Sequence, residues 1–439
     1  MLSIEDFLTR SPATSKEIQS ATGLSQTAVS RRLRDMDSRI VPIKNGRSVR
    51  YAMTQNAFGS DDNLPLFMVD AHGNCTIIAD IRPLAHGGFY VAPRTGCPTV
   101  IMGHDESGVF DGLPYFLDDL RPQGFLGRQI ATELSDQSDS FPSDPRHWNT
   151  DHVGRYLVSN GDDLPGNFKL GHQAHLRLRR KPVMSTQDDY PTLANDVMNG
   201  ILPGSSAGGE QPKFTTFCAE KSSHVIVKFS PQGNSDIARR WKDILITEYH
   251  ASEALHRAAC PAAEVRLIEA DDRIFLESQR FDRSGEHGRL PMISLQSVDI
   301  EFVGDGSSWV NVVNQLLELQ LISEQHVFDT EVLSLFGKLI YNTDMHLGNL
   351  SMGIEGNVFR LLPVYDMCSM GFAPKSGEVP LYRFTPNTTR RSNLSEETQQ
   401  NVYNMARSFW NTLSQDARIS SDLKTFLAEG NPIDRAANT

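Results

Sequence analysis

The sequence predicts an α+β protein in which a small, mostly helical N-terminal domain precedes a larger mixed body. Residues 1–53 carry helix-start and helix-stop residues at short intervals and then a hairpin signal. From residue 64 onward, short apolar runs alternate with long stretches of helical periodicity. The first 53 residues also hold nine basic and five acidic side chains, although the chain as a whole has a net charge of −12. A basic head on an acidic body indicates two separate tasks.

The composition narrows the class of protein. A chain of 439 residues is long enough for several domains and a sizeable core. The first residues are acidic and lack a long apolar run, so we expect neither a signal peptide nor a membrane partner. The five cysteines are scattered and odd in number, which argues against a disulfide framework and against structural zinc. We therefore expect a cytoplasmic protein.

Helix caps in the head lie at the spacing of three short helices. Ser3 is placed to cap a helix through Leu8, and Thr14 with Glu17 makes a capping box for a helix over 15–21. Gly23 is placed to end that helix in a left-handed turn, and Ser25 caps a third helix over 26–36. Two short helices around a glycine turn predict a helix-turn-helix.

The third helix and the hairpin after it predict a DNA-binding surface in a winged helix-turn-helix domain over residues 1–54. The Asn45-Gly46 pair favours a type I′ turn, which would place Arg47 at the tip of a wing. A module that only dimerises or docks on the body is the alternative, and the basic charge favours DNA. One head would bind weakly, so we expect a homodimer on DNA. The outward face of the third helix carries side chains suited to a major groove: Gln26, Thr27, Ser30, Arg31 and Arg34.

The middle of the chain predicts structure without recognisable chemistry. Residues 54–63 are polar and are predicted to be a linker. Short strands follow from Leu64, and residues 109–131 have the pattern of amphipathic helices. We expect residues 63–190 to form a subdomain of their own.

A loop of small residues, 204–214, leads into a strand and is predicted to approach phosphates closely. Lys228 lies on the next strand, 224–229, from which a lysine can reach the same phosphates; the alternative is a plain hairpin with a solvent-facing lysine. Glu248, in the helix predicted over 236–259, either pairs with Lys228 or reaches solvent. Residues 265–270 and 273–279 are predicted to form two strands. Residues 276–281 are predicted to connect two lobes and to offer backbone groups to adenine.

Two acidic residues and an asparagine follow an apolar helical run in the last third of the chain. Asp344 and Asn349 share one loop, and Asp366 ends the apolar run that begins at Phe359. Protein kinases use an Asp to accept a hydroxyl proton, an Asn on the same loop and a later Asp to hold Mg²⁺. The spacing of Asp344 and Asn349 is common in unrelated chains and is weak evidence by itself. The interpretation is supported by the loop, the lysine strand and the helix that precede it in the order found in kinases.

With these pieces in this order, the chain resembles the HipA-like serine/threonine kinases of bacterial type II toxin–antitoxin systems. The resemblance covers about residue 64 to the C-terminal helices, and the fused head makes the chain most similar to the YjjJ branch. The residues that carry it are Ser205–Lys213, His224–Lys228, Thr247–Tyr249, Arg280–Arg283, Asn342–Asn349 and Pro363–Asp366.

The resemblance implies a two-lobed protein-kinase-like fold, with an N-lobe over 191–282 and a helical C-lobe over 283–439. It implies Asp344 as catalytic base, Asn349 and Asp366 as Mg²⁺ ligands, and autophosphorylation at Ser205 or Ser206. It also implies a protein substrate with Ser or Thr, and an antitoxin partner. Gln279 stands where the family often has an acid. The implied ATP-binding residues are Ser206, Ala207, Gly208, Gly209, Gln211, Lys213, Lys228, Gln279, Phe281, His346, Asn349 and Asp366.

The hypothesis from sequence is therefore a Mg·ATP-dependent protein serine/threonine kinase that acts as a toxin and carries a DNA-binding head. One alternative is a DNA-binding regulator whose kinase body is degenerate. Another is a Mg²⁺-dependent nuclease, which leaves the phosphate loop and the lysine strand without a role and ranks last.

Overall fold

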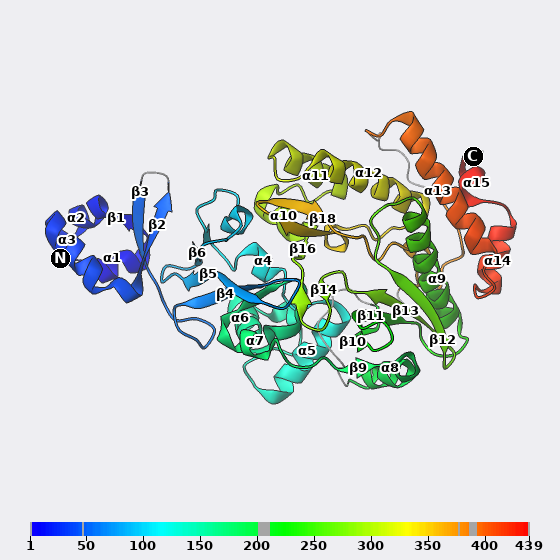
Figure 1. The fold of residues 1–439 in the computed structure, drawn as a ribbon, viewed down its shortest axis with the longest axis horizontal. Coiled ribbons are helices and arrows are strands. Elements are labelled where there is room, and N and C mark those ends of the chain that lie inside the picture. The colour runs from blue at the N-terminus through cyan, green and yellow to red at the C-terminus, as the bar shows by residue number, and fades with distance from the viewer. Residues whose placement is uncertain (1, 46–47, 201–210, 376–377, 386–392, 438–439) are drawn as a thin grey trace.

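The computed structural model describes residues 2–45, 48–200, 211–375, 378–385 and 393–437. The head lies at one end of the molecule and the C-terminal helices at the other, with the mixed body between them (Figure 1). None of the helices in these ranges is both long enough and apolar enough to cross a bilayer.

The head forms the three helices that its caps predict: α1 (Ile4–Arg10), α2 (Ser15–Thr22) and α3 (Gln26–Asp35). The capping box of Thr14 and Glu17 is present, and Gly23 has a φ of 69°, as its left-handed turn requires. A three-stranded antiparallel sheet follows, in the order β1 (Ala13–Thr14), β3 (Ser48–Met53), β2 (Ile40–Asn45). Ala21, which helical spacing assigns to the core, is exposed, and its neighbour Thr22, the last residue of α2, is buried instead.

The segment predicted as a linker, 54–63, is fastened to the body instead. Asp62 accepts hydrogen bonds from Thr54 Oγ1 and, at 2.9 Å, from Arg82 Nη2. The backbone continues the contact, since Ala85 N–H donates to Met53 O at 2.8 Å. Polar composition predicts exposure, but it does not reveal such long-range partners. The apolar side chains of the hairpin that pack against the body are Val41, Ile43 and Ala52, and they meet Leu84 and Tyr90.

The middle region is a five-stranded antiparallel sheet with helices, and the strands predicted from Leu64 onward are confirmed. The sheet order is β7 (Val109–Phe110), β6 (Phe89–Pro93), β5 (Cys75–Pro83), β4 (Leu64–Val69), β8 (Phe168–Leu170). Its helices are α4 (Tyr115–Asp118), α5 (Gly124–Gln137), α6 (Thr150–Asn160) and α7 (Gly171–Arg177).

A second five-stranded sheet carries the predicted lysine strand. Its order is β12 (Val265–Ala270), β13 (Arg273–Gln279), β11 (Ser223–Phe229), β10 (Lys213–Cys218), β9 (Met184–Ser185). The helix α9 (Asp236–Arg257) packs on this sheet, and α8 (Tyr190–Met198) lies near β10. The limits of β12 and β13 agree with the sequence prediction. The predicted connection at 276–281 begins later than expected, because β13 continues to Gln279.

The C-terminal part is mainly helical, with a small sheet of β16 (Ile293–Ser294), β17 (Ser351–Glu355) and β18 (Val358–Leu361). A short hairpin, β14 (Arg283–Ser284) and β15 (Gly288–Arg289), precedes it. Trp410 and Phe409 are fully buried, and the Phe336 ring lies 6.2 Å from that of Phe409. The helices are α10 (Leu295–Phe302), α11 (Trp309–Glu318), α12 (Glu324–Leu339), α13 (Glu396–Ser414), α14 (Ser421–Ala428) and α15 (Pro432–Ala437).

Candidate functional site

Lys228, Glu248 and Asp366 meet in one cluster, although they come from β11, α9 and the segment after β18. Lys228 and Glu248 are buried in it, and the Asp366 side chain is 27% exposed. Lys228 Nζ donates to Glu248 Oε1 at 2.5 Å and also to the carboxylate of Asp366. Lys228 and Glu248 are each only 5% exposed. Lys228 therefore does not face solvent, and of the two alternatives for Glu248 the structure has the pairing with Lys228. An ammonium has three N–H donors, so these two bonds leave one for a further anion.

Charge in this cluster opposes the effect of burial. Burial lowers the pKa of Lys228, but the neighbouring charges of Asp366 and Glu248 outweigh it and raise that pKa above its usual value. Burial raises the pKa of Asp366, yet Lys228 and then Lys213 outweigh it, so the pKa of Asp366 is lowered. Burial raises the pKa of Glu248 even with Lys228 beside it. The pair of Lys228 and Asp366 is therefore charged at neutral pH.

The loop with Asp344 and Asn349 is tied to the segment with Asp366 by two hydrogen bonds. Asn342 Nδ2 donates to Asp366 O at 3.3 Å, and Tyr365 Oη donates to Gly348 O at 3.1 Å. These contacts hold the predicted base, Asp344, on the same side of the fold as the predicted metal ligands. The Asp344 side chain is 49% exposed, so an incoming hydroxyl can reach it.

Asn349 has a defined amide orientation. Its Nδ2 donates to Asp344 O at 2.7 Å, so the amide oxygen stays available as a ligand. Together with the carboxylate of Asp366, this gives hard oxygen donors of the kind that Mg²⁺ prefers. Mg²⁺ is often bound through one or two protein side chains and takes its other ligands from phosphates and water. Among the described residues there is no group of three or more His, Cys, Asp or Glu side chains arranged to hold a metal.

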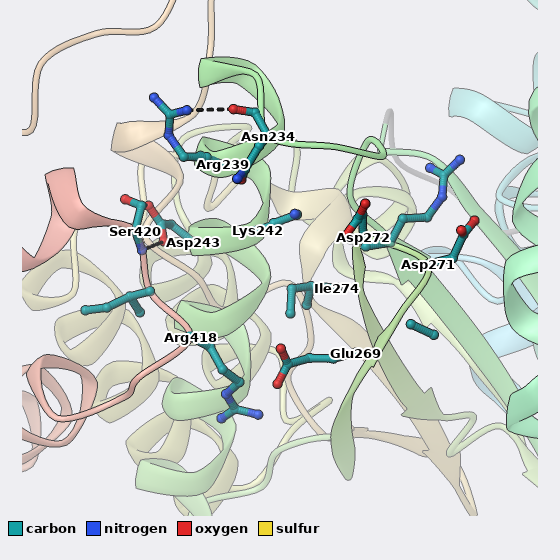
Figure 2. Close-up of a pocket in the computed structure, with 13 residues that line it drawn as sticks. Asn234, Arg239, Lys242, Asp243, Glu269, Asp271, Asp272, Ile274, Arg418 and Ser420 are labelled. Atoms are coloured by element: carbon teal, nitrogen blue, oxygen red, sulfur yellow. Dashed lines mark hydrogen bonds between the residues drawn. The ribbon is translucent and has the colours of Figure 1, made fainter.

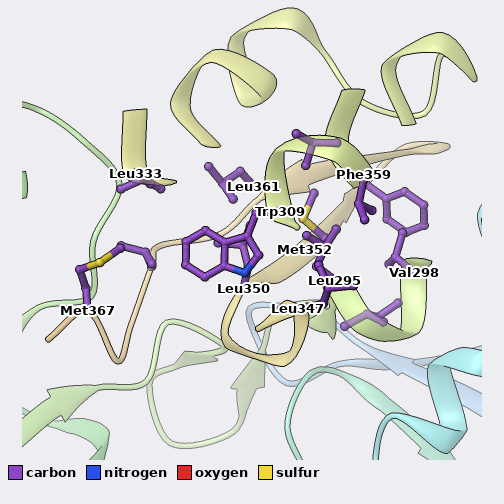
Figure 3. Close-up of a cluster of buried hydrophobic side chains, with 14 of the residues drawn as sticks. Leu295, Val298, Trp309, Leu333, Leu347, Leu350, Met352, Phe359, Leu361 and Met367 are labelled. Carbon is purple, nitrogen blue, oxygen red and sulfur yellow. The ribbon is translucent and has the colours of Figure 1, made fainter. Parts of the chain in front are cut away.

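The backbone of the loop rests on the apolar core of the C-terminal part. Trp309 Nε1 donates to His346 O at 2.8 Å. Leu347 and Leu350 lie in the same buried cluster as Leu295, Met352 and Trp309 (Figure 3). The polar side chains of the loop are therefore carried on buried leucines, which restricts their movement.

Asp366 has a backbone φ of 54°, in the left-handed region that non-glycine residues seldom adopt. The residue lies beyond β18 rather than on a strand, so the chain turns sharply just before the site. Strained backbone of this kind is concentrated at functional sites. The bond from Asn342 Nδ2 to Asp366 O stabilises this conformation.

The predicted phosphate-binding residues are only partly within the described ranges. Lys213 on β10 lies opposite Lys228 on β11 in the antiparallel register, and it is 3% exposed. Gln211 Nε2 is buried and has no hydrogen-bond partner among the described residues, so it is a donor suited to an anion. The residues Ser205, Ser206, Ala207, Gly208 and Gly209 lie outside the described ranges.

Three further residues, Gln279, Phe281 and His346, are predicted to contact the nucleotide. Gln279 ends β13, and its N–H donates to Glu264 O at 2.9 Å, so that donor is not free for adenine. The Phe281 ring lies 5.9 Å from the ring of Tyr365, next to Asp366. His346 is exposed, and its Nε2 lies 3.9 Å from Asp344 Oδ1.

In the head, the predicted DNA-contacting side chains of α3 are all exposed: Gln26, Thr27, Ser30, Arg31 and Arg34. Helix α3 lies at the end of the molecule remote from the body (Figure 1). Arg47 lies outside the described residues. The head packs on the body through its β2–β3 hairpin, so the outward face of α3 stays exposed to solvent.

Sequence reasoning missed the structural role of two groups. Asn342 bonds Asp344 N–H at 3.0 Å as well as Asp366 O; its spacing from Asp344 is a local turn signal, but nothing local indicates the second bond. Arg280 and Arg283 bond the buried Asp282, and Arg283 also reaches Asp163 in the middle region at 3.0 Å. This network joins the middle region to the second sheet.

Under the kinase hypothesis from sequence, replacing Asn342 by alanine should lower kcat about 10- to 100-fold with little change in KM for ATP, because it removes the link between Asp344 and Asp366. Asn342→Asp should lose less, since it can still accept from Asp344 N–H. Initial rates of phosphotransfer measure this difference. Full activity in Asn342→Ala would contradict the assigned role.

Comparison with known proteins identifies the family of the chain. A family model described as "YjjJ-like toxin, middle domain" matches residues 60–179, and one described as "HipA-like C-terminal domain" matches residues 205–426. The toxin YjjJ of Escherichia coli strain K12 is 34% identical over 438 residues, which is 98% of this chain and 96% of that protein.

Among solved structures, the chain is similar to the HipA toxin–antitoxin system of Shewanella oneidensis MR-1, solved with HipB and its operator DNA. The TM-score is 0.57 at 16% identity, over 85% of this chain and 97% of the other. At that identity the likeness concerns the fold alone, and it confirms a mixed α+β body of HipA type. The match to YjjJ along nearly the whole length places this chain in the HipA-like toxin family, in its YjjJ-like branch.

Proposed function

We propose that the chain is a Mg·ATP-dependent protein serine/threonine kinase that acts as a HipA-type toxin in the cytoplasm. The observation that carries this proposal is the buried contact of Lys228 with Glu248 and Asp366, beside a loop that presents Asp344. Three elements far apart in sequence build this cluster. Burying charged groups costs desolvation free energy, and clusters of this kind are concentrated at functional sites.

Each side chain then has a defined role. Asp344 accepts the proton of the attacking hydroxyl, and its partial exposure leaves room for a protein substrate. Asn349 and Asp366 would hold Mg²⁺ through their oxygens, and Lys228, Lys213 and Gln211 would donate to phosphate oxygens. When bound, Mg·ATP supplies the transferable phosphoryl group. Glu248 keeps the Lys228 ammonium in place, and the third N–H of that ammonium would face the nucleotide.

The test is transfer of labelled γ-phosphate from ATP to the chain and to a generic acceptor protein. We expect incorporation with Mg²⁺, none with EDTA, and none in Asp366→Asn, because an amide is a poorer Mg²⁺ ligand than a carboxylate. The exposed Asp188, remote in sequence from the site, provides the control Asp188→Asn, which should retain activity. Activity with EDTA present would contradict the metal assignment.

A second candidate is a DNA-binding regulator whose body does not turn over ATP. The direct ion pair of Lys228 with Asp366 favours it, since the two charges that a nucleotide complex needs neutralise one another. Absence of phosphotransfer in the wild-type chain, together with tight operator binding, would decide for this candidate.

The proposal assigns DNA binding to residues 1–54 as a winged helix-turn-helix, in a dimer, and allows an antitoxin as a further partner. Arg31→Gln and Arg34→Gln should weaken binding to operator DNA. The negative slope of log K against log salt should become less steep by about 1 for each phosphate contact that is lost. Arg10→Gln, an exposed arginine at the end of α1, is the control. Phosphotransfer should not change in these variants. Equal binding by Arg31→Gln and wild type would contradict the assigned face.

A further inference from the structure

A cavity of about 230 Å³ lies where the middle region meets the second sheet, away from Lys228 and Asp344. Its middle-region wall includes Asp163 at the end of η4 (Gly161–Asp163) and Arg177 at the end of α7. Its other wall includes Thr216 on β10 and His224 on β11. We call it the basic cavity. Its volume is below the usual range for drug-sized ligands, so it suits a small molecule.

Positive charge predominates among the side chains that line the basic cavity. The five basic residues are opposed by three acids, Asp162, Asp163 and Glu286. Asp163 is already engaged, since it accepts from Arg283 at 3.0 Å and from Arg289 at 3.3 Å. The basic residues are Arg177, Arg180, Lys181, Arg280 and Arg289.

A second, larger cavity does not have this surplus of basic over acidic side chains. It measures about 510 Å³ and is lined by α9, by the turn between β12 and β13, and by residues that precede α14 (Figure 2). Its four basic side chains are balanced by four acids: Asp243, Glu269, Asp271 and Asp272. Of these two cavities, it is therefore the basic cavity that combines its volume with a surplus of cations.

Arg177 has N–H donors that the described residues leave unused. Its side chain is 23% exposed, but its Nε and Nη2 atoms are buried and have no hydrogen-bond partner among the described residues. Nη2 forms an ion pair with Asp162 Oδ1 at 3.3 Å, without hydrogen-bond geometry. Buried N–H groups are usually satisfied, and a guanidinium often bonds two oxygens of one anion. Arg177 thus presents two donors suited to the oxygens of a phosphate.

The field around the cavity is also positive. Lys169 on β8 is 1% exposed, and Nζ has a long bond of 3.4 Å to Leu164 O. Burial first, and then the charges of Arg289 and Arg283, lower the pKa of Lys169 well below its usual value. A buried anion nearby would relieve this repulsion.

The walls of the cavity are fixed before any ligand binds. Thr216 Oγ1 donates to Val183 O at 3.0 Å, and Phe217 N–H donates to the same oxygen at 3.0 Å. His224 Nε2 bonds Glu286 O at 2.9 Å. Preformed walls reduce the entropy cost of binding. Arg180 and Lys181 remain exposed at the rim, where their charges can attract an anion.

We propose that the basic cavity is a binding site for a small phosphate monoester, held by Arg177, Lys181 and Arg289 and distinct from the ATP site. A phosphate group offers several oxygens at the spacing of a guanidinium fork. The ligand would contact both the middle region and the strands that carry Lys213 and Lys228. Its binding therefore strengthens the contact between those two parts.

The test is a thermal-shift and calorimetric titration of the full chain with inorganic phosphate and with O-phosphoserine, at constant ionic strength and without ATP. We expect saturable binding with a raised Tm, and tighter binding of O-phosphoserine than of phosphate. Arg177→Gln and Lys181→Gln should each weaken binding about 10-fold, as loss of a charge-assisted hydrogen bond predicts. Lys181 is exposed, so its variant keeps the test valid if Arg177→Gln folds poorly.

Two variants separate the basic cavity from other phosphate sites. Arg179→Gln removes an exposed neighbouring arginine that does not line the cavity, and it should bind as wild type does. The double variant Lys228→Met with Glu248→Leu, which leaves no unpaired carboxylate of α9 beside position 228, should also retain binding. Equal weakening by Arg179→Gln would show general charge attraction only. Loss in the double variant with retention in Lys181→Gln would place the phosphate at the ATP site. Either result, or no saturable binding, would overturn the proposal.

Discussion

Replacing Asp344 by asparagine is expected to lower the rate of phosphotransfer about 10²–10⁴-fold while ATP binding stays close to wild type. The carboxylate is 49% exposed, so its loss removes the proton acceptor without disturbing a buried contact. The Asp344→Asn substitution also keeps the size of the side chain. Single-turnover rates with Mg·ATP, together with a binding titration, separate the two effects.

The control for this prediction is Asp188→Asn, in the short helix before α8. That side chain is exposed, so the variant should react as wild type does. Full phosphotransfer by Asp344→Asn would show that another group takes the proton, and the proposed mechanism would then be wrong.

Replacing Lys228 by methionine is expected to have the second large effect, on both activity and stability. It leaves Glu248 buried without its cation, and loss of one partner of a buried ion pair costs about 3–5 kcal/mol in the free energy of unfolding. Phosphotransfer should fall below detection, since the phosphates lose their buried ammonium. Chemical denaturation at neutral pH measures the first effect.

The contribution of the Lys228–Asp366 ion pair to the free energy of unfolding depends on pH. The folded-state pKa of Asp366 is lowered, so its contribution is present above the unfolded value near 4 and is lost as the pH falls. The folded-state pKa of Lys228 is raised, so its contribution is present at all pH values below about 10. The stability difference between wild type and Lys228→Met should therefore be constant at neutral pH and shrink in acid.

A double variant separates the loss of stability from the loss of chemistry. Lys228→Met with Glu248→Leu replaces the pair by apolar groups and should recover much of the stability, because no buried carboxylate of α9 remains unpaired at this site. It should not recover phosphotransfer. Recovery of activity would show that Lys228 acts only in folding.

Local patterns predict the strands and the paired charges of the site well. The period of β12 and β13, the caps of the head and the stripe of α9 that carries Glu248 each depend on neighbouring residues, so the sequence contains the information. The candidate residues Lys228, Glu248 and Asp366 come together as predicted. Which roles they have remains a prediction.

Contacts between distant segments are what local patterns cannot supply. The bond from Asn342 to Asp366 O, and the attachment of Asp62 to Arg82, depend on how whole elements pack. For the same reason polar composition predicts a linker at 54–63, where the structure has a fastened segment.

The docking of the β2–β3 hairpin on the middle sheet gives the head a set direction relative to the loop that presents Asp344. Ala85 N–H and Met53 O join the two parts through the backbone, and Leu84 and Tyr90 cover the hairpin. Two copies seated on a palindromic operator would consequently carry their phosphotransfer sites at a separation dictated by the half-site spacing. The length of the DNA site would then determine whether one copy can phosphorylate the other.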